Sequence, residues 1–246
     1  MISLATLSAV GGCGKSSTAI SLGQLLALRG RKVCIIETDP VNMLSAQVGN
    51  PEWAKTGLFH WLTGKAGWEQ VTHQITDNLL LVPFGEASYP DADDLSSQVC
   101  KNPALLTDLI SDSALTDDTL LIFDTPRLPN GWAESVMRIS DLNLVLMVPD
   151  SASLLSIDKL LPSMLGSRGA SYFLMNRFRS NFVLHLDIWT MTKIKLSHRL
   201  IPFYLHEDQV LSEAFASGST LGDYSPSSQL TEGFEKLANW IDLELG

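Results

Sequence analysis

The residues best suited to chemistry lie in the stretch from Ser8 to Ser17, which reads SAVGGCGKSS. It holds three glycines within four residues, followed by Lys15 and Ser16. Glycines allow successive backbone N–H groups to turn inward around a phosphate, and a helix N-terminus adds a favourable dipole. We therefore expect Lys15 to contact the β- and γ-phosphates of a nucleotide, and the Ser16 hydroxyl to ligate the Mg²⁺ that accompanies them.

The segments on either side of this stretch are those that a phosphate-binding loop requires. An apolar run over residues 1–7 precedes it and an apolar-periodic segment over 19–29 follows it, which predicts strand, loop and helix. The alternative is a glycine-rich turn that only joins strand to helix, but such a turn needs neither three close glycines nor a following Lys-Ser pair. The predicted nucleotide-binding residues of the loop are Gly11, Gly12, Cys13, Gly14, Lys15, Ser16 and Ser17.

Acidic residues follow two of the predicted strands. The run 32–37 leads into Glu37-Thr38-Asp39-Pro40, where strand alternation would turn both acids to one side. The hydrophobic run 120–123 ends at Asp124, the pattern of a Walker B element, whose carboxylate helps to hold Mg²⁺. Because ligands gather at the carboxyl ends of strands in open α/β sheets, we expect these acids to face the loop. For Glu37 and Asp39 alone, an ordinary loop cap is the alternative.

Strands and helices alternate along the rest of the chain. The predicted strands are 1–7, 32–37, 79–84, 120–123, 142–148, 172–175 and 200–204. The predicted helices are 17–29, 44–48, 57–62, 103–110, 131–139, 154–165, 184–196, 208–216 and a last one from residue 231, and residues 86–94 are expected to form an exposed acidic loop. This alternation predicts a single α/β domain over residues 1–246, with a mostly parallel, doubly wound sheet of the P-loop type.

The residue after the predicted strand 172–175 bears on the choice of nucleotide base. GTP-binding proteins use an N-K-x-D pattern whose aspartate accepts hydrogen bonds from guanine, but here Asn176 is followed at the fourth position by Arg179. Adenine is therefore the better candidate, with Asn176 bonding the base. The alternative is that Asn176 is a turn residue at the end of a strand.

Charge and composition disfavour two classes of partner. The formal net charge is −10, with 17 basic against 27 acidic residues. Nonspecific DNA binding and polybasic membrane binding both need a positive face, so we expect neither nucleic acid nor lipid as a direct partner. A local basic patch remains open from Lys193, Lys195, His198 and Arg199, although a solvated helix face is the favoured reading of these residues. The last helix has an acidic polar face, so we expect it to pack on the sheet.

Cysteine content and the N-terminus indicate a cytoplasmic chain. The three cysteines are widely spaced and odd in number, which favours reduced thiols, and no His or Cys spacing suggests a structural metal. The N-terminal apolar run has no preceding positive charge, so it is predicted to be a buried strand and not a signal peptide. No uncharged apolar run approaches the ~20 residues that span a bilayer.

The spacing G-G-x-G-K-S resembles the deviant P-loop of the ParA/MinD family of ATPases, usually K-G-G-x-G-K-[ST]. This chain departs from that pattern at Val10, where the family usually carries a lysine that reaches the partner's nucleotide in the dimer. Ala9 also replaces the first glycine of the general P-loop pattern. The resemblance implies that Asp39 is the switch I acid that orients the attacking water and that Asp124 is the switch II acid linked to Mg²⁺. The implied catalytic residues are Lys15, Asp39 and Asp124, and the implied Mg²⁺ ligands are Ser16, Asp39 and Asp124.

Looser motifs, among them Leu81-Val82-Pro83-Phe84-Gly85 and Gly222-Asp223-Tyr224, are similar to the MinD-type ATPases of bacterial cellulose synthase operons, the BcsQ (YhjQ) family. That resemblance implies a cytoplasmic protein that binds ATP as a sandwich homodimer and helps to assemble or place the cellulose synthase. The implied partners are small cytosolic proteins of the same operons, of the BcsR and BcsE kinds, and the inner-membrane synthase itself, to which the protein would be recruited.

The missing lysine at Val10 implies slow or partner-dependent ATP hydrolysis. Arg127, beside the switch II acid, is a candidate substitute, and a surface salt bridge is the alternative role for that side chain. Two other functions stay open. One is a DNA-partitioning or division-positioning ATPase of the same superfamily, and the other is a scaffold that holds nucleotide without hydrolysing it.

Overall fold

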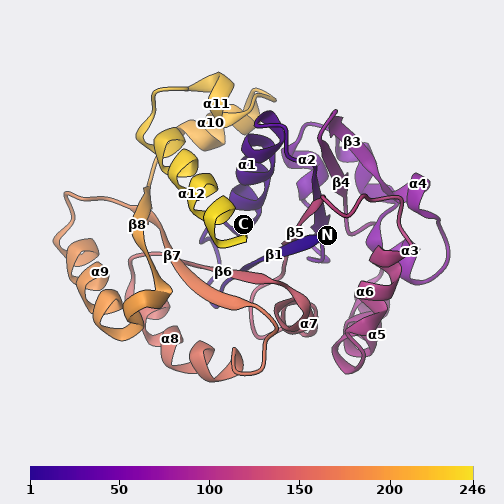
Figure 1. The fold of residues 1–246 in the computed structure, drawn as a ribbon, viewed down its shortest axis with the longest axis horizontal. Coiled ribbons are helices and arrows are strands. Elements are labelled where there is room, and N and C mark those ends of the chain that lie inside the picture. Colours follow the sequence, from indigo (N-terminus) through magenta and orange to yellow (C-terminus); the bar gives the residue numbers. More distant parts are fainter. Residues whose placement is uncertain (246) are drawn as a thin grey trace.

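The computed structural model describes residues 1–245, whose strands all belong to one eight-stranded sheet with helices on both faces (Figure 1). The strand order is β3-β4-β2-β5-β1-β6-β7-β8, and every neighbouring pair except β3–β4 is parallel. The prediction of a mostly parallel, doubly wound sheet is thus confirmed. The strands are β1 (Ile2–Leu7), β2 (Val33–Glu37), β3 (His73–Thr76), β4 (Leu79–Val82), β5 (Leu120–Asp124), β6 (Leu142–Met147), β7 (Ala170–Phe178) and β8 (Leu200–His206).

Successive residues of the central strands face two separate cores, one on each side of the sheet. In β1, Leu4 belongs to one core and Ala5 to the other, and Ile35 and Ile36 divide in the same way in β2. A parallel sheet buried on both faces needs such near-continuous apolar strands. The Leu4 side is covered by α1 (Lys15–Leu28), α2 (Leu44–Gln47), α10 (Val210–Ala216), α11 (Leu221–Tyr224) and α12 (Gln229–Leu245). The Ala5 side is covered by α3 (Leu58–Leu62), α4 (Trp68–Val71), α5 (Tyr89–Lys101), α6 (Ala104–Ser111), α7 (Gly131–Ile139), α8 (Ser151–Ser163) and α9 (Val183–Leu196).

Several sequence-based predictions of secondary structure differ from the structure. The predicted acidic loop 86–94 contains the beginning of α5, where the Ser88 hydroxyl accepts a hydrogen bond from the Asp91 amide (3.3 Å) and Pro90 lies in the first turn. Both features favour a helix N-terminus. An edge strand, β3, pairs antiparallel with β4 where no strand was predicted. Finally, β7 continues to Phe178, so Asn176 lies within a strand and the turn-residue alternative is wrong.

Two of the basic residues near the end of α9 make contacts within the chain. Lys195 forms an ion pair with Asp158 of α8 (2.7 Å), and the Lys193 ammonium lies 5.0 Å from the centre of the Trp189 ring. The three cysteines are free thiols, as predicted. Within residues 1–245, no helix combines the length and the apolar character needed to cross a membrane.

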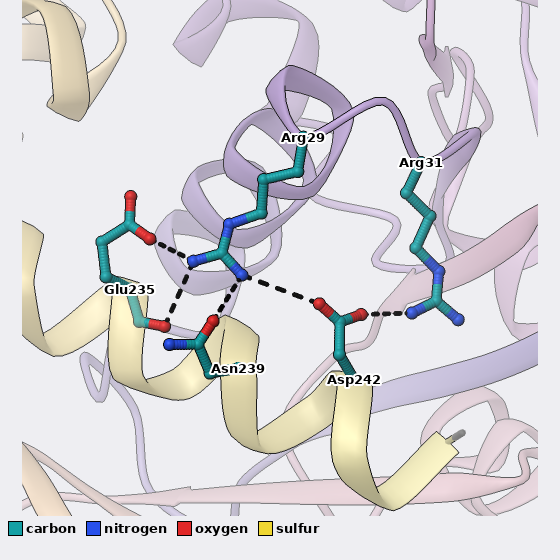
Figure 2. Close-up of polar contacts among 5 residues, drawn as sticks. All are labelled: Arg29, Arg31, Glu235, Asn239 and Asp242. Atoms are coloured by element: carbon teal, nitrogen blue, oxygen red, sulfur yellow. Dashed lines mark hydrogen bonds and ion pairs between the residues drawn. The ribbon is translucent and has the colours of Figure 1, made fainter.

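The C-terminal helix α12 packs on the sheet, and its acidic face contacts two arginines at the end of α1 (Figure 2). Arg29 donates to Asn239 Oδ1 (2.8 Å) and forms ion pairs with Glu235 and Asp242. Arg31 reaches the other oxygen of Asp242. Acidic residues of this helix therefore form ion pairs with basic residues of the same chain, while Phe234, Leu237 and Ile241 are buried on its other face.

We expect Arg29→Ala to lower the free energy of unfolding by about 1 kcal/mol, because the Arg29 side chain is 29% exposed and such surface ion pairs contribute little each. The difference from the parent protein should shrink in about 1 M salt, which screens exposed charges. Urea unfolding measures both effects. As a control, Lys159→Ala removes an exposed cation outside these ion pairs and should leave stability unchanged. A loss for Arg29→Ala that salt does not reduce would contradict the electrostatic explanation.

Candidate functional site

The loop between β1 and α1 forms a cradle of backbone amides, which we call the P-loop cradle and define as Gly11 to Ser17. Gly12 and Gly14 have positive φ angles of 70° and 87°, a backbone conformation that favours glycine. Among the described residues, no group accepts a hydrogen bond from the backbone N–H groups of the cradle. These donors and the N-terminus of α1 are therefore available together for an anion.

Two side chains at the end of β7 fix the orientation of the cradle's peptide groups. Asn176 Nδ2 donates to the Cys13 carbonyl (2.8 Å), and Arg177 Nη1 donates to the Gly12 carbonyl (2.9 Å). Because C=O and N–H point to opposite sides of a trans peptide, these bonds aim the amides of Cys13 and Gly14 away from β7. Gly14 is required for this contact, since a Cβ there would lie 2.6 Å from Asn176 Nδ2.

A cavity of about 620 Å³ lies beside the cradle, a size typical of small-molecule sites. Its wall includes Gly12 to Ser17, Asn176 and the loop from His206 to Gln209. Arg177 connects two parts of this wall, because its guanidinium donates to the Gly12 carbonyl and also pairs with Glu207 (3.0 Å). Arg179 pairs with the same carboxylate. The sequence indicated Asn176 as a site residue. It gave no signal for the Arg177–Glu207 contact, because nothing in either segment specifies the other.

The carboxylate of Asp124, at the end of β5, is fully buried next to the cradle. Its Oδ1 accepts from the Thr6 hydroxyl (3.3 Å), whereas its Oδ2 has no hydrogen-bond partner within residues 1–245. Burial raises the pKa of Asp124 to about 6, while the Ser16 hydroxyl and the Lys15 charge favour its ionised form. Ser16 thus faces this carboxylate without completing a hydrogen bond to Oδ2.

Asp39 approaches the same carboxylate from β2. The Asp39 charge contributes to the raised pKa of Asp124, so the structure brings the two acids together as predicted. Thr38 sets this approach, because its amide (2.8 Å) and its hydroxyl (2.9 Å) both donate to the Asp124 carbonyl. Asp39 itself is half-buried, and its Oδ1 accepts from the Val41 amide (3.0 Å). The charges of Lys15 and Asp39 and the hydroxyl of Ser16 therefore all act on the Asp124 carboxylate.

Glu37 does not share the orientation expected for it. Its Oε1 accepts from the amides of Met43 (2.6 Å) and Leu44 (3.1 Å), and its Oε2 accepts from the Phe84 amide (3.4 Å). The chain folds back over Glu37, so this carboxylate holds the loop after β2 and does not face the P-loop cradle. Burial, reinforced by the nearby Asp124 charge, raises the pKa of Glu37 to about 8.

The donor set beside the cradle fits Mg²⁺ bound together with a phosphate. Mg²⁺ prefers oxygen ligands and usually takes only one or two protein carboxylates, with phosphate oxygens and waters completing its shell. The unpartnered buried Oδ2 of Asp124 and the adjacent Ser16 hydroxyl are such oxygens. Within residues 1–245, no group of three or more His, Cys, Asp or Glu side chains could form an all-protein metal cage. The residues present therefore suit a cation that arrives with a nucleotide.

A family model described as cellulose biosynthesis protein BcsQ matches residues 1–241. The chain belongs to the BcsQ family. Among curated relatives, the cellulose biosynthesis protein BcsQ of Salmonella typhi is 23% identical over 239 residues, which cover 94% of this chain and 90% of the relative. The resemblance inferred from the P-loop and the scattered motifs is thus confirmed at the level of the family.

Solved structures of MinD and of McdA share the fold. Apo McdA from Cyanothece superposes with a TM-score of 0.81 at 20% identity, covering 97% of this chain and 99% of that one. The septum site-determining protein MinD from Pyrococcus horikoshii, solved with Mg-ADP, gives a TM-score of 0.80 at 22% identity over 98% and 96% of the two chains. This BcsQ-family chain therefore has the fold of the MinD-type ATPases.

We expect Glu37 to make the protein less stable as the pH rises. Its pKa is about 8 in the folded state against an ordinary value of 4.5, so between these values the folded state binds more protons than the unfolded chain. The free energy of unfolding must then fall with rising pH, by at most about 1.4 kcal/mol per pH unit from one group. Glu37→Gln removes this titration and should flatten the slope between about pH 6.5 and 8, above the pKa of Asp124.

Urea unfolding at several pH values measures this slope. Glu86→Gln is the matched control, because Glu86 is exposed and its replacement should leave the parental slope intact. Equal slopes in the parent and in Glu37→Gln would show that the Glu37 carboxylate is already ionised in the folded protein.

Proposed function

We propose that this protein binds ATP with Mg²⁺ and acts as an ATP-dependent dimeric switch. The observation that carries the proposal is the P-loop cradle, in which a run of backbone amides without hydrogen-bond acceptors lies beside Lys15 and the unpartnered Asp124 oxygen. A triphosphate satisfies the amides and Lys15, and the cation that accompanies it satisfies Asp124. The MinD structure solved with Mg-ADP supports this assignment through the shared fold.

Each predicted site residue has a role in this proposal. Lys15 neutralises the β- and γ-phosphates, and the Mg²⁺ ligands are Ser16, Asp39 and Asp124. When bound, Mg²⁺ neutralises charge on the phosphate oxygens. Asp39 also orients the water that attacks the γ-phosphate. Asn176 bonds the adenine base with its second amide hydrogen, because its first donates to the Cys13 carbonyl and Asn176 lines the cavity.

The loop after Asp39 is suited to report which nucleotide is bound. The Asn42 side chain ties this loop to neighbouring segments, donating to the Ala54 carbonyl (2.8 Å) and accepting from the Gly85 amide (3.2 Å). A change at Asp39 therefore reaches the segments that contain Ala54 and Gly85. We propose that nucleotide binding orders this surface and that the twin subunit and other partners recognise it.

The cellular role is proposed from family membership. The matched family is named for cellulose biosynthesis, so we assign the switch to the assembly, placement or activity of a bacterial cellulose synthase. We place the protein in the cytoplasm, recruited to the inner membrane by its partners, which are the synthase and small cytosolic proteins of the same operon. A DNA-partitioning role is disfavoured by the net charge of −10.

Val10 favours slow hydrolysis or a scaffold that holds nucleotide without turnover. Its side chain packs against the core on the α1 side of the sheet, so this position supplies no charge to a nucleotide. Phosphoryl transfer depends mainly on positioning and charge neutralisation, and an arginine that supplies the missing charge can be worth roughly 10³ to 10⁵ in rate.

Lys15→Ala should abolish ATP binding and nucleotide-dependent dimerisation, because it removes the cation at the β- and γ-phosphates. Calorimetry with ATP and Mg²⁺ measures the affinity, and sedimentation with and without nucleotide measures the dimer. Lys159→Ala serves as the control, since this exposed residue on α8 lies outside the cavity wall. Unchanged ATP affinity in Lys15→Ala would refute the assignment of the cradle.

A further inference from the structure

A second cation lies beside the P-loop cradle and comes from the segment after β5. Arg127 Nη1 lies 4.0 Å from the position that a Cβ on Gly11 would occupy. Arg127 is exposed, and within residues 1–245 it takes part in no ion pair or hydrogen bond. Every other arginine except Arg199 pairs with a carboxylate. The salt-bridge alternative for Arg127 therefore has no support in the structure.

The backbone on both sides of Arg127 is anchored to the strand that leads into the cradle. The Thr125 hydroxyl donates to the Thr6 carbonyl (2.6 Å), and the Leu128 amide donates to the Ser8 carbonyl (2.8 Å). Leu128 is also buried, and Pro126 restricts the intervening backbone. These contacts fix the backbone from which the Arg127 side chain extends to Gly11.

This guanidinium can supply, from within the same chain, the positive charge that the loop lacks. Val10 immediately precedes Gly11, is partly buried against the core and carries no charge, so it brings no cation to the phosphate site. An arginine supplied by the same chain can perform this task in phosphoryl transfer, as it does in some GTP-hydrolysing proteins. A guanidinium also suits a phosphate well, because its planar set of donors can form two parallel hydrogen bonds to phosphate oxygens.

We propose that Arg127 binds the γ-phosphate of ATP in the same subunit and replaces the charge missing at Val10, an inference that rests on the proposed function. In the reaction a water oxygen bonds to the γ-phosphorus, the bond from that phosphorus to the bridging oxygen breaks, and ADP leaves with the electron pair. One proton of the water stays on the inorganic phosphate and the other passes to solvent. Arg127 stabilises the negative charge on the transferred group during this step.

The test compares ATP and ADP affinities, because only ATP carries the γ-phosphate. For Arg127→Ala we expect unchanged ADP affinity and an ATP-to-ADP affinity ratio at least about tenfold below the parental ratio, which is the loss of one charge-assisted hydrogen bond. Arg127→Lys should restore part of the ratio. Where the parent protein releases phosphate in single-turnover assays, the rate in Arg127→Ala should fall by about 10³-fold or more.

Arg199→Ala is the matched control, because Arg199 also lacks an ion pair but directly precedes β8. It therefore lies at the amino ends of the parallel strands, whereas the cradle lies at their carboxyl ends. It should leave both affinities and the rate unchanged. A parental ATP-to-ADP ratio in Arg127→Ala would overturn the proposal even in a protein without measurable turnover. If Arg127→Ala lowers the ratio only at protein concentrations at which the parent protein dimerises, the charge reaches the partner's nucleotide, and the assignment to the same subunit is overturned.

The design separates this proposal from the proposed function. If the parent protein does not bind ATP, or if Lys15→Ala binds it as well as the parent does, the nucleotide site itself is misassigned. If ATP binding depends on Lys15 while Arg127→Ala behaves as the parent, only the role of Arg127 fails.

Discussion

The orientation of the peptide groups in the P-loop cradle is the constraint on which the rest of the site depends. A loop rich in glycine can turn its carbonyls or its amides toward a ligand, and carbonyl oxygens would repel a triphosphate. Here β7 supplies two donors, from Asn176 and Arg177, that hold the carbonyls of Cys13 and Gly12. Because β7 lies two places from β1 in the sheet, the order of the strands determines whether these donors reach the loop. The anion site is therefore a product of the whole fold.

Two buried acids, at the carboxyl ends of β5 and β2, determine the electrostatics near the site. Asp124 has one oxygen without a partner, and Glu37 is surrounded by backbone amides but carries a raised pKa. Burying such groups costs free energy unless hydrogen bonds or opposite charges compensate. Part of that cost at Asp124 is relieved by Lys15. A cation bound with a nucleotide would relieve more, so in our account ligand binding and stability of this edge of the sheet are linked.

Hydrophobic periodicity and turn residues predicted those helices and loops whose conformation depends mainly on neighbouring residues in the sequence. The predicted helix 131–139 and the observed α7 have the same first and last residues. The glycine loop, with its flanking strand and helix, lies where the spacing indicated. The family resemblance likewise rested on that loop and on short local motifs. Contacts between distant segments were not accessible in this way. Asn176 and Cys13 are 163 residues apart, and no pattern in β7 states that its asparagine will support a loop on another strand. Glu37 was misjudged because strand alternation says nothing of a chain that folds back over its own strand end.

A crystal structure of the protein with Mg²⁺ and a non-hydrolysable ATP analogue tests the central claim most directly. Our account predicts phosphate oxygens within about 3 Å of the cradle amides, with the Gly12 and Cys13 carbonyls still held by Arg177 and Asn176. The cation should contact the free oxygen of Asp124. A nucleotide bound away from the cradle, or a cradle whose carbonyls have turned toward the phosphates, would contradict it.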